Sequence, residues 1–335
     1  MSTPRERREE AERILCNPGA MLSAESRGRM VEEEPCEIRT CFQRDIDRIV
    51  HSKSFRRLKH KTQVFLQPEG DHYRTRMTHT IEVVRIARTI SRALGLNEDL
   101  TEAVAWGHDL GHTPFGHAGE RALAELCPEG FQHNEQSLRV VDVLEKNGRG
   151  LNLTYEVRDG ILNHVGEGTA CTLEGRVVRL ADRLAYINHD VDDAIRAGIL
   201  TDDDIPEEIR QTVGAKYSQR LNTLIKAVIE YGERTGEVGM ETDMTAVVER
   251  FHDFMYARVY RNPVAKGEES KVLGILEGLN NYYLGDLNRL PEDYRALLAK
   301  YSGPRVVCDY ISGMTDKFAV DKFEEIYVPA AWKIR

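Results

Sequence analysis

The chain has 335 residues, of which 41% are hydrophobic and 30% are charged, and its formal net charge is −9. This apolar content is enough to fill a large core, so the composition excludes intrinsic disorder for most of the chain, and no run approaches the roughly 18 consecutive apolar residues of a membrane span. The acidic balance argues against general nucleic-acid binding. The first residues, MSTPRERREEAERIL, lack the apolar segment of a secretory signal, and the six cysteines form no C-x-x-C pair, which predicts a cytoplasmic protein with reduced thiols.

Helical periodicity dominates the chain and predicts a mainly α fold. Apolar residues recur at 3.6-residue spacing from Thr78 to Leu94, and Gly95 stands where a C-cap would. Asn97 is expected to cap a second helix that runs to about Leu110. An unbroken apolar stripe predicts a long helix from Leu173 that ends by Gly198. Further helices are expected at 217–231, 242–260, 270–283 and 291–301, and short strands at 63–65, 306–308 and 326–328.

Positive charge is concentrated between His51 and Arg92, where ten basic residues and three acidic residues give +7. A basic segment in an acidic protein indicates local recognition of a small polyanion. On charge alone, a solvated helix face explains the segment equally well.

Histidines point to a metal site. Six of the eleven histidines lie between positions 72 and 133, and His79 and His108 both continue inward-facing apolar stripes. One histidine on such a stripe is usually a core residue, but imidazoles and carboxylates on several inward faces are costly unless they are paired or bound to a cation. We therefore expect His79, the adjacent His108–Asp109 pair and Asp182 to converge on a divalent metal such as Mg²⁺, Mn²⁺, Fe²⁺, Ni²⁺ or Zn²⁺.

The segment HDLGH at 108–112 has the histidine spacing of the metalloprotease motif H-E-x-x-H. That chemistry needs a glutamate after the first histidine and a continuous helix beneath both. Here an aspartate follows His108, and Gly111 and Pro114 interrupt the helix, so the metalloprotease alternative is disfavoured. The sequence also lacks the glycine-rich phosphate-binding motifs, so side chains and a metal would have to hold any nucleotide.

Longer segments carry a resemblance to a known family. They are FRRLKHKTQVF (55–65), YRTRMTHTIEV (73–83), HDLGHTPFGHAGE (108–120), FQHNEQSLRV (131–140), RLADRLAYINHDVDDA (179–194) and DYISGMTDKFA (309–319). The order of His79, His108-Asp109 and Asp182 resembles the HD-domain metal phosphohydrolases. Together, the segments resemble the bacterial deoxyguanosine triphosphate triphosphohydrolases and their broader deoxynucleotide (dNTP) triphosphohydrolase relatives, from about residue 40 to 325.

This resemblance implies a metal-dependent enzyme that hydrolyses a dNTP to a deoxynucleoside and tripolyphosphate. The implied metal ligands are His79, His108, Asp109 and Asp182, and the metal is Mg, Mn or another divalent ion. The resemblance also implies a catalytic dyad of His117 and Glu120, with His133 near the leaving group or phosphate. The implied substrate-binding residues are Gln63 at the 3′-hydroxyl, Arg76 and Arg183 at phosphate, and Tyr186 and Asp190 at the sugar or triphosphate.

The expected architecture is an HD-domain helical bundle with a helical C-terminal extension. We expect an N-terminal segment over 1–45, an HD core over 46–200 and a C-terminal helical part over 201–335 packed on the core, with the acidic turn 201–209 at the boundary. Related proteins often form homo-oligomers, in some members with a regulatory dNTP site, and single-stranded nucleic acid is a secondary expected partner. Two alternatives stay open: another HD phosphohydrolase, such as a nucleotidase or phosphodiesterase, and a nucleotide- or nucleic-acid-binding regulator with little turnover.

Overall fold

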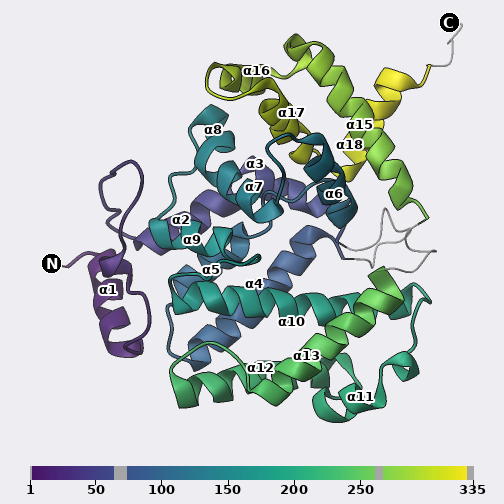
Figure 1. Ribbon diagram of the computed structural model, residues 1–335. Coiled ribbons are helices and arrows are strands. Elements are labelled where there is room, and N and C mark those ends of the chain that lie inside the picture. The colour runs from purple at the N-terminus through teal and green to yellow at the C-terminus, as the bar shows by residue number, and fades with distance from the viewer. Residues whose placement is uncertain (1, 64–73, 261–266, 330–335) are drawn as a thin grey trace, which may run out of the picture. The chain divides into compact units, whose positions relative to one another are not determined.

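The computed structural model describes residues 2–63, 74–260 and 267–329, and its fold is mainly α, as predicted (Figure 1). Within those ranges there is no strand, and extended pairing is limited to two isolated bridges, Arg29 with Thr154 and Thr62 with Thr75. No helix in the described ranges is long and apolar enough to cross a bilayer.

The chain divides into two units that interleave along the sequence. Unit 1 comprises Met1–His51, Thr78–His108 and Asn152–Ala265, and unit 2 comprises Ser52–Met77, Asp109–Leu151 and Lys266–Arg335. The acidic turn 201–209 falls inside unit 1. The expected division into 1–45, 46–200 and 201–335 stays a prediction.

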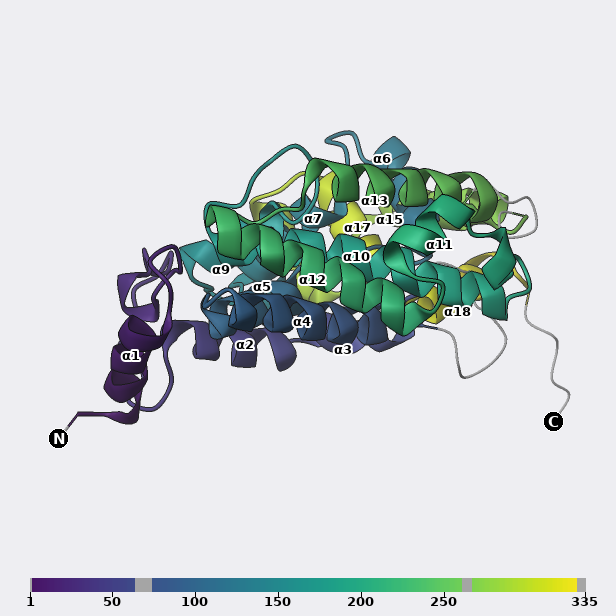
Figure 2. The same ribbon diagram turned by 90° about the horizontal axis from the view of Figure 1, so that it is seen from below.

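Unit 1 is a helical bundle in which α10 contacts α5, α9, α12 and α13. Figures 1 and 2 show α10, α12 and α13 side by side. The helices are α1 (Pro4–Leu15), α2 (Cys41–Val50), α4 (Arg76–Ala93, whose first two residues belong to unit 2), α5 (Glu98–Gly107), α9 (Tyr155–Leu162), α10 (Leu173–Arg196), α11 (Glu207–Val213), α12 (Tyr217–Thr235) and α13 (Thr242–Met255). Short helical turns lie at η1 (Ser23–Glu25), η4 (Asp202–Asp204) and η5 (Tyr256–Tyr260).

Local signals set the ends of the helices that carry histidines and carboxylates. The Asn97 side chain accepts hydrogen bonds from the N–H groups of Asp99 and Leu100 and so begins α5, as predicted. The α5 helix ends at Gly107, slightly earlier than expected, and His108 is its C-cap. Helices α5 and α9 pack closely because Gly160 has no side chain. A Cβ at this position would lie only 2.6 Å from Val104 Cγ2. This packing places His108 at the end of a well-buried helix.

Unit 2 is built around α15, which contacts α6, α17 and α18. Its helices are α3 (Lys53–Arg57), α6 (Gly116–Leu126), α7 (His133–Arg139), α8 (Glu145–Gly148), α15 (Glu269–Gly285), α16 (Glu292–Arg295), α17 (Gly303–Ser312) and α18 (Asp316–Tyr327). Short turns lie at η2 (Leu58–His60), η3 (Val140–Leu144), η6 (Leu287–Arg289) and η7 (Ala296–Ala299). The core of unit 2 includes Leu123, Leu276 and Val306, which are fully buried.

Two predicted strands are wrong. Residues 306–308 lie inside α17, and residues 326 and 327 end α18. Short apolar runs do not distinguish a buried strand from a buried helix, and here the Ser302 side chain caps α17 by accepting a hydrogen bond from the N–H of Arg305. The third predicted strand, at 63–65, lies outside the described residues except for Gln63, and so does His72.

Candidate functional site

Three of the predicted metal ligands converge in unit 1. His79 lies on α4, His108 caps α5, and Asp182 lies on α10. His79 Nε2 is 2.9 Å from Asp182 Oδ1, and His108 Nε2 is 3.8 Å from the same oxygen. Both imidazoles are almost fully buried. Three separate helices therefore bring two imidazole nitrogens to one carboxylate.

The surroundings orient His108 in the way that metal-binding histidines require. Its Nδ1 lies 2.7 Å from the carbonyl oxygen of Ala105, which can only accept a hydrogen bond, so Nδ1 carries the proton and Nε2 keeps its lone pair. Burial favours a neutral Asp182 carboxyl, but the hydrogen bond from His79 and the nearby His108 outweigh that effect and hold the pKa of Asp182 well below its usual range. Asp182 is thus an anion beside two imidazoles, and this donor set fits a divalent cation.

The other predicted residues of unit 1 lie along α10. Asp182, Tyr186 and Asp190 follow at intervals of four residues and share one face of the helix. Asp190 is fully buried, and the ring of Tyr186 lies 6.4 Å from the ring of His252 on α13. Arg183 is half-buried and forms no ion pair with any residue that the structure describes.

Unit 2 holds the remaining six predicted residues. Asp109 follows His108 in the chain, and its Oδ2 accepts a hydrogen bond of 2.8 Å from Arg76 Nη1, with both side chains buried. Gly116, at φ +56°, begins α6 close to both predicted substrate contacts: a Cβ there would lie 3.3 Å from the Gln63 carbonyl oxygen and 3.6 Å from Arg76 Nη2. Gln63 and Arg76 therefore flank the first turn of α6.

Glu120 connects two imidazoles in unit 2. Its Oε2 lies 3.3 Å from His117 Nδ1, one helical turn away on α6, as the predicted dyad requires. Its Oε1 accepts a hydrogen bond of 2.9 Å from the backbone N–H of His133 and lies 2.8 Å from His133 Nδ1. The dyad predicted from sequence is thus part of a triad of side chains centred on Glu120.

Electrostatics favour the charged forms of Glu120 and His133. Burial favours a neutral Glu120 carboxyl, but the hydrogen bonds with His117 and His133 outweigh it and hold the pKa of Glu120 far below its usual range. Burial likewise favours a neutral His133, but the hydrogen bond and the charge of Glu120 raise the pKa of His133. A carboxylate that stays ionised can orient an imidazole and increase its basicity.

The structure adds three histidines that the sequence analysis did not include among the site residues. His112 stacks on His133 with ring centroids 4.7 Å apart, and burial holds the pKa of His112 well below its usual value. His164 packs edge-on against His108 at 5.1 Å, and His189 lies 5.8 Å from His79. The HDLGH spacing was a usable signal for His112. Helical spacing from Asp182 was a signal for His189, whereas nothing in the sequence marked His164.

The local structure also bears on the metalloprotease alternative. The HDLGH segment does not lie on a continuous helix, because α5 ends at Gly107 and α6 begins at Gly116. The helical support that a zincin motif needs is therefore missing.

Comparison with known proteins gives consistent matches. A family model of the HD domain matches residues 76–187, and a model described as a phosphohydrolase-associated domain matches residues 238–325. A deoxyguanosinetriphosphate triphosphohydrolase-like protein of Caldanaerobacter subterraneus subsp. tengcongensis is 53% identical, with 98% of this chain and 97% of the relative covered. A protein of the same name from Desulfatibacillum aliphaticivorans is 50% identical, with 98% and 99% covered. The crystal structure of a hypothetical protein from Aquifex aeolicus aligns with a TM-score of 0.45 and 18% identity over 84% of this chain and 71% of that chain.

Proposed function

Since this chain belongs to the HD-domain deoxyguanosinetriphosphate triphosphohydrolase-like family, we propose that it hydrolyses a deoxynucleoside triphosphate to a deoxynucleoside and tripolyphosphate. Membership of this family supports a phosphohydrolase activity. The specific substrate, a dNTP, and the products, a deoxynucleoside and tripolyphosphate, are what we propose. Support for this proposal comes from the names of the relatives and from the donor sets gathered in each unit.

The contact of His79 and His108 with one carboxylate, Asp182, supports the proposal most strongly. Asp109 adds a second carboxylate as the residue after His108, and the hydrogen bond from Arg76 fixes one of its oxygens. We infer that these four ligands hold one divalent cation, either Mg, Mn or another metal. Such a cation, when bound, would stabilise the negative charge on the oxygens of the phosphate that the water attacks.

His117 and Glu120 are the proposed acid–base residues, with His133 beside them. In the reaction, a water oxygen bonds to the α-phosphorus, the bond from that phosphorus to the sugar 5′-oxygen breaks, and the 5′-oxygen leaves with a proton. Glu120 holds Nδ1 of His117, which leaves Nε2 to take or hold a proton of the water. His133, on the other oxygen of Glu120, is the candidate donor to the leaving group.

The substrate contacts follow from charge and position. Arg76 lies one turn before His79 on α4, and Arg183 directly follows Asp182, so both guanidinium groups flank proposed metal ligands and suit a polyanionic phosphate chain. Gln63 is proposed to bind the 3′-hydroxyl, and Tyr186 and Asp190 the sugar or triphosphate. A homo-oligomer, a regulatory dNTP, secondary binding of single-stranded nucleic acid and a cytoplasmic location stay predictions.

Product analysis tests the proposal directly. The four dNTPs, alone and in pairs, are incubated with the purified chain and each divalent metal, and the products are separated by chromatography. Intact tripolyphosphate with free deoxynucleoside is the expected result. Pairs are included because one dNTP can act as the activator of another.

The same assay separates the alternatives. Orthophosphate or a released monophosphate would identify another HD phosphohydrolase, such as a nucleotidase or phosphodiesterase. Absence of turnover with every dNTP, together with oligonucleotide binding that falls steeply as salt rises, would identify a binding regulator instead.

A further inference from the structure

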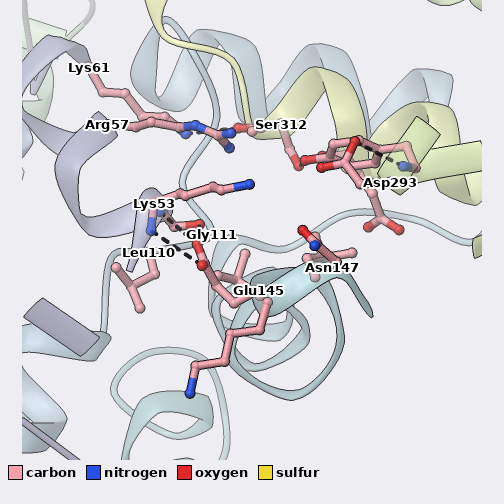
Figure 3. Close-up of a pocket in the computed structure, with 16 residues that line it drawn as sticks. Lys53, Arg57, Lys61, Leu110, Gly111, Glu145, Asn147, Asp293 and Ser312 are labelled. Carbon is pink, nitrogen blue, oxygen red and sulfur yellow. Dashed lines mark hydrogen bonds between the residues drawn. The ribbon is translucent and has the colours of Figure 1, made fainter. Parts of the chain in front are cut away.

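Unit 2 encloses a cavity that none of the proposed active-site residues lines (Figure 3). Its volume is about 30 Å³, roughly two to three times the minimum that holds one water molecule. Its walls come from α3, the turn at Leu110 and Gly111, η3 with α8, α16, and the end of α17. The lining residues Lys53 and Asn147 are exposed, so the cavity reaches solvent at that edge. This space admits a single small group such as a phosphate but not a nucleoside.

Four cationic side chains line this cavity: Lys146 is exposed on α8, and the other three come from one segment of the chain. Lys53 and Arg57 lie one helical turn apart on α3, and Lys61 follows in the next turn of the chain. Figure 3 shows the side chains of Lys53 and Arg57 extending into the space between Gly111 and Ser312. Lys53 and Arg57 form no ion pair with any carboxylate in the described parts of the chain. Positive charge is thus presented to a small cavity without a carboxylate partner.

Lys61 is held in place by the backbone of unit 2. Its ammonium group is buried and donates to the carbonyl oxygen of His112 and, at 2.8 Å, to that of Ser312. These bonds use two of the three donors of an ammonium group. Burial, with the neighbouring Arg57 acting in the same direction, lowers the pKa of Lys61 to about 7. An anion in the cavity would stabilise the charged form of this lysine.

The carboxylates that line the cavity are already engaged. Glu145 accepts hydrogen bonds of 2.7 Å from both the N–H and the hydroxyl of Ser54. Asp309 is fully buried and paired with Arg139 at 2.7 Å and Arg305 at 3.0 Å. Among the carboxylates that line the cavity in the described part of the chain, only that of Asp293 is exposed. The net charge around Lys53 and Arg57 is therefore positive.

The backbone of the opposite wall is strained. Lys146 and Asn147 adopt left-handed conformations, with φ of 51° and 57°. Each such residue costs on the order of 1 kcal/mol or more, and such outliers cluster at ligand-binding and switch regions. On the cationic side, a Cβ at Gly313 would lie 3.1 Å from both Arg57 Nη1 and Tyr294 Oη, so the glycine leaves room for the guanidinium beside the cavity.

We propose that this cavity binds a phosphate-type oxyanion, held by Lys53, Arg57 and the third donor of Lys61. The anion is either free inorganic phosphate or polyphosphate, or the terminal phosphate of a nucleotide whose remainder lies outside. The site goes beyond the proposed function, because the catalytic and substrate residues lie elsewhere. Leu110 and Gly111, which directly follow Asp109, form part of the wall, so a bound anion contacts the backbone that leads from a proposed metal ligand.

Lysine footprinting on the full chain tests the proposal. The protein is treated with a chelator so that no turnover occurs, and it is acetylated in the presence of inorganic phosphate, tripolyphosphate or a dNTP, with chloride at matched ionic strength as reference. Acetylation at each lysine is read by mass spectrometry. Lys53 should be protected at least about threefold because a charge-assisted contact sequesters its ammonium group. Lys59, which is exposed on the neighbouring η2 turn and does not line the cavity, is the internal control and should not change.

Variants test whether the protection of Lys53 depends on an anion that Arg57 also holds. Arg57→Met should remove the protection of Lys53, Arg57→Lys should retain part of it, and Lys59→Met should leave it intact. Protection by inorganic phosphate identifies a free anion as the ligand, whereas protection by tripolyphosphate or a dNTP alone identifies a terminal phosphate. Equal changes at Lys53 and Lys59, or no protection with any of the three probes, would overturn the proposal. Protection in the wild-type chain decides this even if Arg57→Met fails to fold.

Discussion

At the residue scale, Glu120 is the side chain on which the proposed chemistry depends, because its two oxygens hold His117 and His133 separately. We expect Glu120→Ala and His117→Ala each to lower kcat by about 10²–10⁴-fold, since both remove the oriented base. The double variant should be little worse than either single variant, because residues that act as one unit are not additive. Steady-state kinetics with a dNTP and metal analysis of each protein measure this.

Glu125→Ala is the matched control for these variants, because Glu125 is exposed on the same helix. It should retain wild-type kcat. A His117→Ala protein that keeps its metal and more than about a tenth of wild-type kcat would contradict the dyad. His133 would then be the better candidate for the base.

Gln63 offers a second test at this scale, through the sugar. Gln63 is buried, and its carbonyl oxygen lies next to the first turn of α6. If its side chain binds the 3′-hydroxyl, a substrate without that group would leave a buried amide without its partner. We expect a dideoxynucleotide to lose about 1–3 kcal/mol in kcat/KM relative to the dNTP. The control is Gln63→Ala, for which the two substrates should become nearly equal. Equal kcat/KM for both substrates with the wild-type enzyme would reject the contact.

At the element scale, long amphipathic helices were predictable and short elements were not. The stripe from Leu173 predicted α10, and Asn97 predicted the beginning of α5, because periodicity and capping are local properties. Residues 306–308 were mistaken for a strand because three apolar residues carry no period. The contact between Glu120 and His133 spans 13 residues across two helices, so only tertiary packing could reveal it.

Glu174 predicts a pH dependence that belongs to the N-terminal end of α10. Its Oε1 accepts hydrogen bonds from the N–H groups of Met21 at 3.0 Å and Asn97 at 2.9 Å. Burial raises the pKa of Glu174 to about 7, although these N–H groups oppose the shift. Because the same carboxyl in the unfolded chain titrates near 4.5, its contribution to stability is complete below that pH and is lost as pH rises through about 7.

Glu174→Gln should remove this loss, because the amide resembles the protonated acid. The free energy of unfolding of the variant relative to wild type should rise by about 1–3 kcal/mol between pH 5 and pH 8. Urea unfolding at several pH values measures it. The same substitution at Glu10, which is exposed on α1, is the control and should not change the profile. A pH-independent difference between Glu174→Gln and wild type would refute the raised pKa.

At the scale of the whole molecule, the chain passes repeatedly between two units, and sequence reasoning could not foresee this. Unit 2 is assembled from 52–77, 109–151 and 266–335, and contacts between such distant segments leave no periodic signal. The proposed metal ligands reflect this interleaving, because the peptide bond between His108 and Asp109 joins the two units. The family motifs indicated these residues as ligands without any account of the fold, and their role as ligands stays a proposal.

Metal removal is the corresponding test on the whole chain. If His79, His108 and Asp182 hold a cation only in the folded state, free metal at 100 times its dissociation constant adds about 2.7 kcal/mol to the free energy of unfolding. Calorimetry should therefore show Tm falling by a few °C after chelation and recovering when metal is restored. Asp182→Asn should abolish this response, because it removes the negative charge of the carboxylate that would bind the cation together with the two imidazoles. Asp192→Asn, on the same helix and paired with Arg196 at the surface, should keep it. A full metal response in Asp182→Asn would exclude Asp182 as a ligand.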